Sequence, residues 1–143
     1  MKSMKQLSLA ETGFLPKAGK QTRKAVFLAE MDTVVPWSRL EALIEPFYPQ
    51  KGNGRPPMLL STMLRIHFLQ QWFGYSDPAM EEALHDIPLL RQFAGLDAFE
   101  DAMPDESTIL RFRHLLEQHE LAAALFAEVN TVLSEKGLSM KRG

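Results

Sequence analysis

DESTILRFRHLLEQH, residues 105–119, predicts one amphipathic helix with a clearly marked beginning. Pro104 stiffens the approach, Asp105 can accept a hydrogen bond from a free amide of the first turn, and Glu106 lies where the helix dipole favours negative charge. The apolar residues recur at three- and four-residue spacing, which predicts one buried face formed by Ile109, Phe112, Leu115 and Leu116. The rest of the chain is expected to pack against this face.

The other side of the same helix carries polar groups, among them Thr108, Arg111 and Gln118. Hydroxyl, guanidinium and carboxamide groups reach phosphates and base edges when a helix enters a DNA groove. We therefore take Thr108, Arg111 and Arg113 as DNA-binding candidates. An ordinary solvated helix face is the alternative, because most exposed arginines do nothing specific. Arg113 has another possible role, which is to hold the acidic loop 97–105 or the helix at 121–136 through a charge-assisted hydrogen bond.

Composition indicates one globular domain. The chain has 143 residues, of which 45% are hydrophobic and 24% charged. It has no cysteine, which excludes disulfides and thiolate metal sites and fits a reducing cytoplasm, where we expect the protein to reside. No apolar run approaches the roughly 20 residues that span a bilayer, so we expect no membrane partner.

Charge is distributed unevenly along the chain. Residues 1–24 hold six basic residues and one acidic residue, a net charge of +5, whereas residues 77–106 hold nine acidic residues and one basic residue, a net charge of −8. The first 19 residues lack periodicity, and we read 1–19 as a flexible basic arm and 20–143 as the folded domain. The arm could neutralise DNA phosphates or serve only to keep the protein soluble. The end of the basic stretch 1–24, just after the arm, supplies three further DNA-binding candidates: Lys20, Arg23 and Lys24.

Apolar periodicity and turn residues predict an all-α fold, a compact bundle of about seven helices with helix-turn-helix-like elements. The expected helices lie at 20–35, 37–47, 58–73, 77–87, 88–94, 105–119 and 121–136. Gly74 is the expected carboxyl cap of the central helix, and Asp77 the expected amino cap of the next one. The glycine- and proline-rich segment 48–57, YPQKGNGRPP, is a loop with two cations and no acid, so Lys51 and Arg55 join the DNA-binding candidates.

No set of residues assembles an active site. Glu82 and His85 have the Glu-x-x-His spacing of carboxylate-bridged metal sites, but such sites need a second copy of the motif, and we expect a solvent-facing pair. His67 lies in the apolar central segment, where we expect a hydrogen-bonded core residue. The sequence contains no glycine-rich phosphate loop, no serine elbow and no zinc spacing.

Three long stretches resemble one known family in the same order: 21–37 (QTRKAVFLAEMDTVVPW), 47–84 (FYPQKGNGRPPMLLSTMLRIHFLQQWFGYSDPAMEEAL) and 103–126 (MPDESTILRFRHLLEQHELAAALF). They resemble the amino-terminal helical region of bacterial insertion-sequence transposases of the insertion sequence five family. The resemblance implies binding to DNA at terminal inverted repeats and a role in assembly. In that family a following domain resembling ribonuclease H holds divalent metal, such as magnesium, on Asp-Asp-Glu carboxylates.

None of those three carboxylates has a matching position in this sequence. We therefore expect a chain that is truncated before the catalytic domain, carries no cofactor of its own and is inactive alone, since two-metal chemistry needs ligands for its ions. The expected partners are terminal inverted repeats and either a second copy of the chain or an intact transposase. The alternative is a regulatory remnant that dimerises or docks on intact transposase without binding DNA, which the acidic centre and the net charge of −2 favour.

Overall fold

Helix α3 (Leu60–Phe73) lies at the centre of the protein, because apolar side chains occur on nearly all of its faces. The structure is a computed structural model that describes residues 21–50, 52, 54 and 56–137. Within those residues it contains no strand, and the prediction of an all-α fold with about seven helices is confirmed. The helices around α3 are α1 (Arg23–Val34), α2 (Trp37–Ile44) with the short 3-10 helix η2 (Glu45–Phe47), α4 (Asp77–Asp86), α5 (Pro88–Ala94), α6 (Glu106–Gln118) and α7 (Leu121–Glu135).

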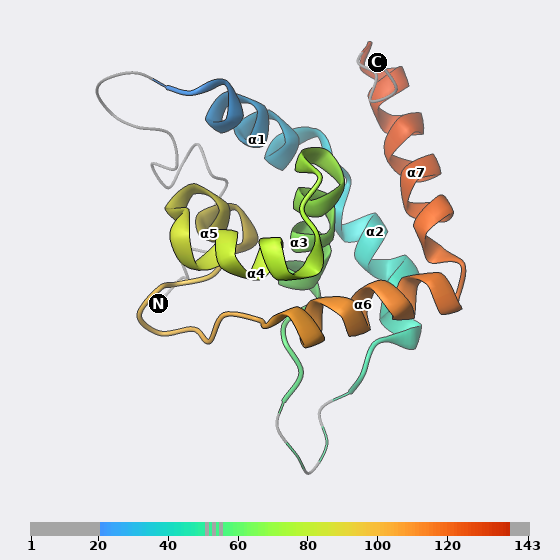
Figure 1. Ribbon diagram of the computed structural model, residues 1–143. Helices are drawn as coiled ribbons and strands as arrows, with labels where there is room; N and C mark the ends of the chain where they lie inside the picture. Colours follow the sequence, from blue (N-terminus) through green and yellow to red (C-terminus); the bar gives the residue numbers. More distant parts are fainter. Residues whose placement is uncertain (1–20, 51, 53, 55, 138–143) are drawn as a thin grey trace, which may run out of the picture.

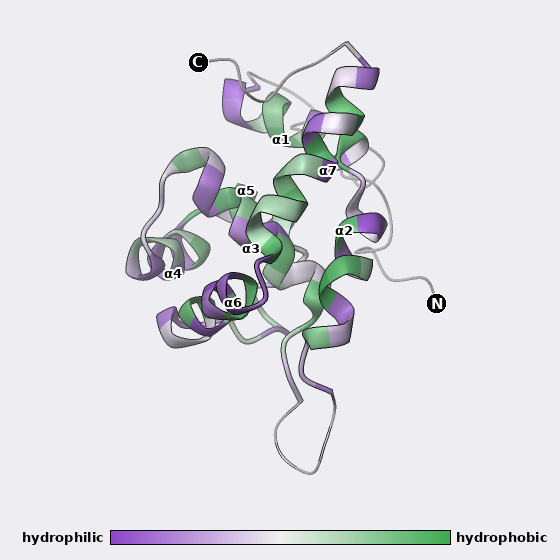
Figure 2. Ribbon diagram, turned by 90° about the vertical axis from the view of Figure 1, so that its right-hand side faces the viewer, coloured by the Kyte–Doolittle hydropathy of each residue, from purple (hydrophilic) through white to green (hydrophobic). Residues whose placement is uncertain are grey.

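Large side chains fill the space around α3. Met63, Leu64, Ile66 and Phe68 are almost fully buried, and helices α2, α4, α5 and α6 pack against this core. Figure 2 shows that α3 is coloured mostly as apolar, whereas α6 carries both polar and apolar residues. The helix ends at Gly74, whose φ of 73° is left-handed, so the expected carboxyl cap is confirmed.

A half-buried arginine on α3 holds three other helices together. Arg65 on α3 donates from Nη2 to Oδ1 of Asp32 at 2.8 Å and from Nη1 to the carbonyl oxygen of Phe93 at 3.1 Å. Its guanidinium also lies over the rings of Trp37 and Phe93, at 4.4 and 4.8 Å from their centres. Because these partners come from α1, α5 and the start of α2, Arg65 fixes how the three helices meet on α3.

Helix α4 begins differently from the sequence-based prediction. Its amino cap is Ser76, whose Oγ accepts a hydrogen bond from the Ala79 amide at 3.2 Å, and Asp77 is the first helical residue. The predicted Asp77 cap is therefore wrong by one position. The Asp77 carboxylate therefore does not cap α4. It accepts hydrogen bonds from side chains of α3 and α6 instead.

Helices α4 and α6 lie side by side and run in opposite directions (Figure 1). The start of α4 meets the second half of α6 at Asp77 and Arg113, while Glu81, further along α4, meets the first residue of α6 at Glu106. Helix α6 also packs on α3 and α7. In a helix-turn-helix motif, the helix immediately before α6, which is α5, would be the main helix packed against α6. In this structure α4 packs against α6 in that place.

Candidate nucleic-acid interface

The beginning of α6 is held by two carboxylates. Asp105 caps the helix, with Oδ1 accepting from the Thr108 amide at 2.8 Å, and Oε1 of Glu81 accepts from the Glu106 amide at 2.8 Å. The hydrogen bond from the Thr108 amide, first among several causes, lowers the pKa of Asp105 below its ordinary value. Since these two amides already have carboxylate partners, neither is free to donate to a DNA phosphate.

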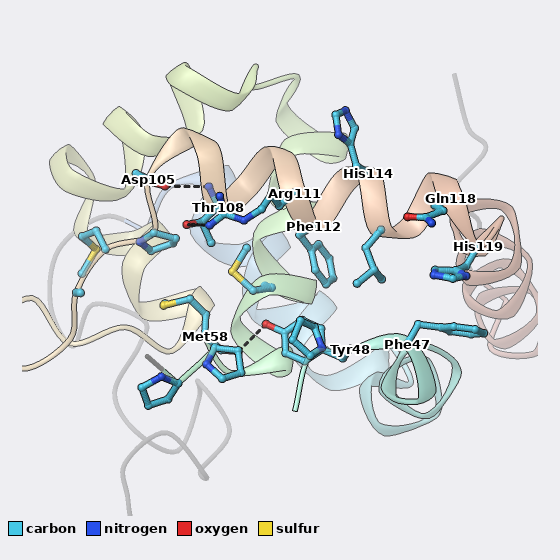
Figure 3. A pocket seen from close by; sticks show the side chains of 18 residues that line it. Phe47, Tyr48, Met58, Asp105, Thr108, Arg111, Phe112, His114, Gln118 and His119 are labelled. Atoms are coloured by element: carbon cyan, nitrogen blue, oxygen red, sulfur yellow. Dashed lines mark hydrogen bonds between the residues drawn. The ribbon is translucent and has the colours of Figure 1, made fainter. Parts of the chain in front are cut away.

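The two faces of α6 separate as the sequence predicts. Ile109, Phe112 and Leu116 are buried in the core. Leu115, which the spacing also placed in the buried face, is only half-buried and lines a groove. Thr108, Arg111 and Gln118 line the same groove (Figure 3), so the prediction that they share a face is confirmed. Arg111 is exposed, and its Nη2 donates to Oγ1 of Thr108 at 3.3 Å.

The groove has a volume of about 890 Å³ and lies between α6, the segment 102–105 and the two ends of the loop that joins η2 to α3. Its floor is apolar and rich in methionine: Tyr48, Met58, Met63, Met103, Phe112 and Leu115. Its polar edge is formed by α6 and the residues on either side of it: Asp105, Thr108, Arg111, His114, Gln118 and His119. The groove thus combines an adaptable apolar surface with hydrogen-bonding groups.

A hydrogen bond closes the base of the 48–58 loop. The Tyr48 hydroxyl donates to the carbonyl oxygen of Met58 at 2.5 Å (Figure 3). Burial raises the pKa of Tyr48 to about 12, so this hydroxyl keeps its proton at neutral pH and remains a donor. The two ends of the loop are therefore held together beside the groove. Lys51 and Arg55, the candidates within this loop, lie outside the described residues.

An aromatic stack closes the far end of the groove. The rings of Phe47 on η2 and His119 after α6 lie 4.1 Å apart, centre to centre, and are inclined by 22°. This contact joins two segments that are more than 70 positions apart in the sequence. Nothing in the sequence of either segment indicates the pairing, since Phe47 also fits the apolar pattern of the preceding helix.

Arg113 points away from the groove and toward α4. Its Nε and Nη2 donate to Oδ1 and Oδ2 of Asp77 at 3.2 and 2.7 Å, and its Nη1 lies 3.4 Å from Oε2 of Glu117. The hydrogen bond from Arg113 lowers the pKa of Asp77, and the same bond raises the pKa of Arg113. The suggested partners of Arg113, the loop 97–105 and the last helix, were therefore wrong. The structure separates Arg113 from Thr108 and Arg111.

The remaining candidates lie at another end of the molecule. Arg23 and Lys24 form the first turn of α1, and the Lys24 ammonium lies 4.7 Å from the ring centre of Phe73. Figures 1 and 2 both place α1 at the end of the molecule opposite the 48–58 loop, with α6 between them. The structure therefore does not bring Arg23 and Lys24 together with Thr108 and Arg111. Lys20 lies outside the described residues.

The metal-site candidate is not assembled in the part of the chain that the structure describes. Glu82 and His85 are both exposed on α4, and the described residues contain no group of three or more histidines or acids close enough to hold an ion. Among the same residues, no helix is both long and apolar enough to cross a bilayer.

His67 differs from the expectation of a hydrogen-bonded core residue. It is buried, its ring contacts Phe68 and Phe112, and its Nδ1 has no hydrogen-bond partner among the described residues. Burial, with a smaller contribution from the positive charge of Arg113, lowers the pKa of His67 to about 4. The ring is therefore neutral at physiological pH and behaves as an apolar side chain of the core.

Comparison with known families matches residues 16–115 to a transposase domain, DUF772. The matched region runs through α1 to α5 and includes most of α6, with Thr108, Arg111, Phe112 and Arg113. It covers well over half of the 143 residues. No solved structure matches the chain. The groove and the capped helix beside it are therefore features of a chain that belongs to the DUF772 transposase-domain family.

Proposed function

We propose that this transposase-family chain is a DNA-binding domain of an insertion-sequence transposase of the insertion sequence five family, and that the groove face of α6 contacts the terminal inverted repeats. The observation that supports this most is the shared face of Thr108, Arg111 and Gln118 on a firmly capped helix. Family membership supports a transposase-related role for the chain.

The spacing of these side chains suits a helix lying along a DNA groove. At about 1.5 Å per residue, Thr108 and Gln118 are about 15 Å apart along the axis, a distance comparable to about four base steps. Arginine can pair with both acceptors on a guanine edge, and glutamine with an adenine edge. In this proposal Arg111 and Gln118 read bases, while Thr108 contacts a phosphate.

The other candidates take different parts in the proposal. Lys51 and Arg55 belong to the loop whose base lies beside the groove, and in this proposal they neutralise phosphates. Lys20, Arg23 and Lys24 would add contacts at a distance from α6, without sequence preference. Arg113 positions α6 on α4 instead of touching DNA, because its Nε and Nη2 donate to Asp77 and its Nη1 donates to Glu117.

A second candidate function is regulatory docking on an intact transposase without DNA binding. The segment between α5 and α6 favours it, because Asp97, Glu100 and Asp101 surround Phe99, whose side chain is 97% exposed. A carboxylate-rich surface repels DNA and suits a protein partner. A gel shift with terminal-repeat DNA, run beside a sizing experiment with the intact transposase, separates this function from the first.

The direct test measures fluorescence anisotropy with a duplex carrying the terminal repeats that flank the gene, against a scrambled duplex at the same salt concentration. We expect tighter binding to the repeat. Arg111→Gln should weaken repeat binding by about 5- to 150-fold, the range that corresponds to one lost base contact of about 1–3 kcal/mol.

Lys136→Gln is the matched control. It removes the same charge from an exposed residue at the end of α7, far from the groove, and should leave the affinity unchanged. Equal affinity of the wild-type chain for repeat and scrambled DNA would overturn the proposal. Equal losses of DNA affinity in Arg111→Gln and Lys136→Gln would show that the net charge of the protein, and not a base contact of Arg111, sets the affinity.

The resemblance to Asp-Asp-Glu transposases gives this chain no catalytic residue and no magnesium ligand. We therefore expect repeat binding without strand transfer. An assay with labelled donor DNA, plasmid target and magnesium or manganese tests that expectation, and strand transfer by the purified chain would contradict it.

A further inference from the structure

Binding of paired DNA to α6 does not account for the apolar floor of the groove. A paired duplex presents phosphates, sugars and hydrogen-bonding base edges to a protein, while stacking covers the flat faces of its bases. Met58, Met103 and Leu115 in the floor offer apolar surface, which suits neither phosphates nor hydrogen-bonding base edges. The occupant that fits this groove therefore has an apolar surface of its own.

The groove has the size and the layout of a ligand site. Its volume of about 890 Å³ lies within the range of about 300–1,000 Å³ that is typical of pockets for organic ligands. Helix α6 places Thr108, Arg111 and Gln118 along one edge of this space, above the apolar floor (Figure 3). A flat ring system with hydrogen-bonding groups on its rim matches both surfaces, and a nucleobase has this form.

The charges that line the groove largely offset each other. Asp105 and Arg111 are the only acidic and basic residues, histidine aside, among the described residues of the lining. After the hydrogen bonds from Thr108, the positive charge of Arg111 is a further cause of the lowered pKa of Asp105. Because placing a charge on an apolar surface costs hydration energy, the groove suits an uncharged ring better than a phosphate or a strongly charged peptide.

Two rings at the end of the groove offer a stacking surface. Phe47 and His119 both line the groove, with their ring centres 4.1 Å apart. The side chain of Phe47 is 43% exposed and His119 is exposed, so a ligand can reach the pair. Proteins bind unpaired bases by stacking them on aromatic rings and by forming hydrogen bonds to their edges.

We propose that the α6 groove binds unpaired nucleotides of DNA, with the bases on the apolar floor and against the Phe47–His119 stack, and with their edges paired to Arg111 and Gln118. The inference rests on the proposed contact of α6 with DNA and names the form of DNA that the groove takes. The faces of a base become available where it leaves the stack inside a duplex or where a strand ends unpaired. Unstacking costs least at mismatched or already single-stranded positions, so such DNA should bind more tightly.

Fluorescence anisotropy with three forms of the terminal-repeat DNA tests the inference. The first is fully paired, the second has a short run of non-complementary bases in its middle, and the third has an unpaired overhang. The wild-type chain should bind at least one of the two partly unpaired forms about 5- to 150-fold more tightly than the paired form, as expected for one stacked base. A gain with the central mismatch identifies a base from the interior, and a gain confined to the overhang identifies a strand end.

Variants of the groove locate the gain in affinity. Phe47→Ala and His119→Ala should each remove most of it, and Met58→Gln, which makes the floor polar at a similar side-chain length, should reduce it. Phe47→Tyr keeps an aromatic face and should retain the gain. Val26→Ala, which truncates an exposed apolar residue on α1 at another end of the molecule, is the control and should leave it unchanged. Melting temperatures identify any variant that fails to fold, and the exposed His119 then decides the test.

Equal affinity of the wild type for the paired form and both partly unpaired forms would overturn the inference and leave the groove to a protein segment. A gain that folded Phe47→Ala and His119→Ala both retain would also overturn it. The proposed function fails by a different result, which is equal affinity for repeat and scrambled sequences in paired form. A chain that prefers unpaired nucleotides of any sequence would keep this inference and lose repeat recognition.

Discussion

Arg113 on α6 donates two hydrogen bonds to the carboxylate of Asp77 on α4, from Nε to Oδ1 at 3.2 Å and from Nη2 to Oδ2 at 2.7 Å. The same carboxylate accepts from Nε2 of Gln70 on α3 at 2.9 Å. Asp77 therefore joins three helices through side chains, and α6 is held on the bundle at a point where its groove face is not involved.

This relationship predicts different results for two nearby arginines. Arg113→Ala should lower the free energy of unfolding by about 1–3 kcal/mol. We expect a value near the lower end of this range, because the Arg113 side chain is one-third exposed and water screens its charge. Arg111→Ala should cost only about 0–1 kcal/mol, since it makes no ion pair among the described residues. Urea denaturation of the two variants measures both values. A larger loss for Arg111→Ala would assign that residue to the fold.

Phe112 should be the most important single side chain of α6 for stability. It is 5% exposed, and its ring lies 6.1 Å from that of Tyr48 and 6.3 Å from that of His67. Phe112→Ala should cost about 3–5 kcal/mol through lost contacts and a residual cavity. Phe99→Ala is the control, because the side chain of Phe99 is almost fully exposed. Similar melting temperatures for the two variants would contradict this placement.

His67 should make stability depend on pH in a defined window. Its pKa is about 4 in the folded protein and 6.5 in the unfolded chain, so between these values the unfolded state binds more protons. Stability is therefore full above pH 6.5 and falls as the pH decreases toward 4, by up to about 3 kcal/mol. Asp77, whose pKa is lowered, contributes stability that is lost only below its ordinary value of 3.8.

Denaturation curves of the wild type and His67→Gln between pH 4 and 7 check this prediction. The variant should be less sensitive to pH across the window, whatever its stability at pH 7. An unchanged slope would mean that other groups cause the acid sensitivity.

The basic arm should contribute to DNA affinity without contributing to sequence preference. A deletion that tests this has to stop at residue 20, because Thr22 caps α1 and Arg23 is its first residue. Removing residues 1–20 takes away four lysines and should reduce the slope of log affinity against log salt by up to about 3–4 units. Binding to repeat and scrambled duplexes should weaken equally. A truncated chain that kept its salt slope but lost discrimination would reverse these roles.

The sequence alone determined the features that depend on residues close in the chain. The Asp105 cap, the glycine that ends α3, and the burial of Ile109, Phe112 and Leu116 on α6 all follow from residues within one or two helical turns. The buried residues of α7 also match the period of the sequence, from Leu121 to Leu133. These features could be predicted because hydrogen bonds at helix ends and apolar spacing are local.

Only the tertiary structure decided which residues meet across helices. Val26 is apolar, but the packing of α1 turns Ala25, Leu28 and Met31 inward and leaves Val26 48% exposed. The Asp77 partner of Arg113, the closed base of the 48–58 loop and the methionine floor of the groove each join segments that are at least ten positions apart. Such contacts depend on how helices cross and on which side chains fill the space between them. The spacing of apolar residues along a single helix determines neither property.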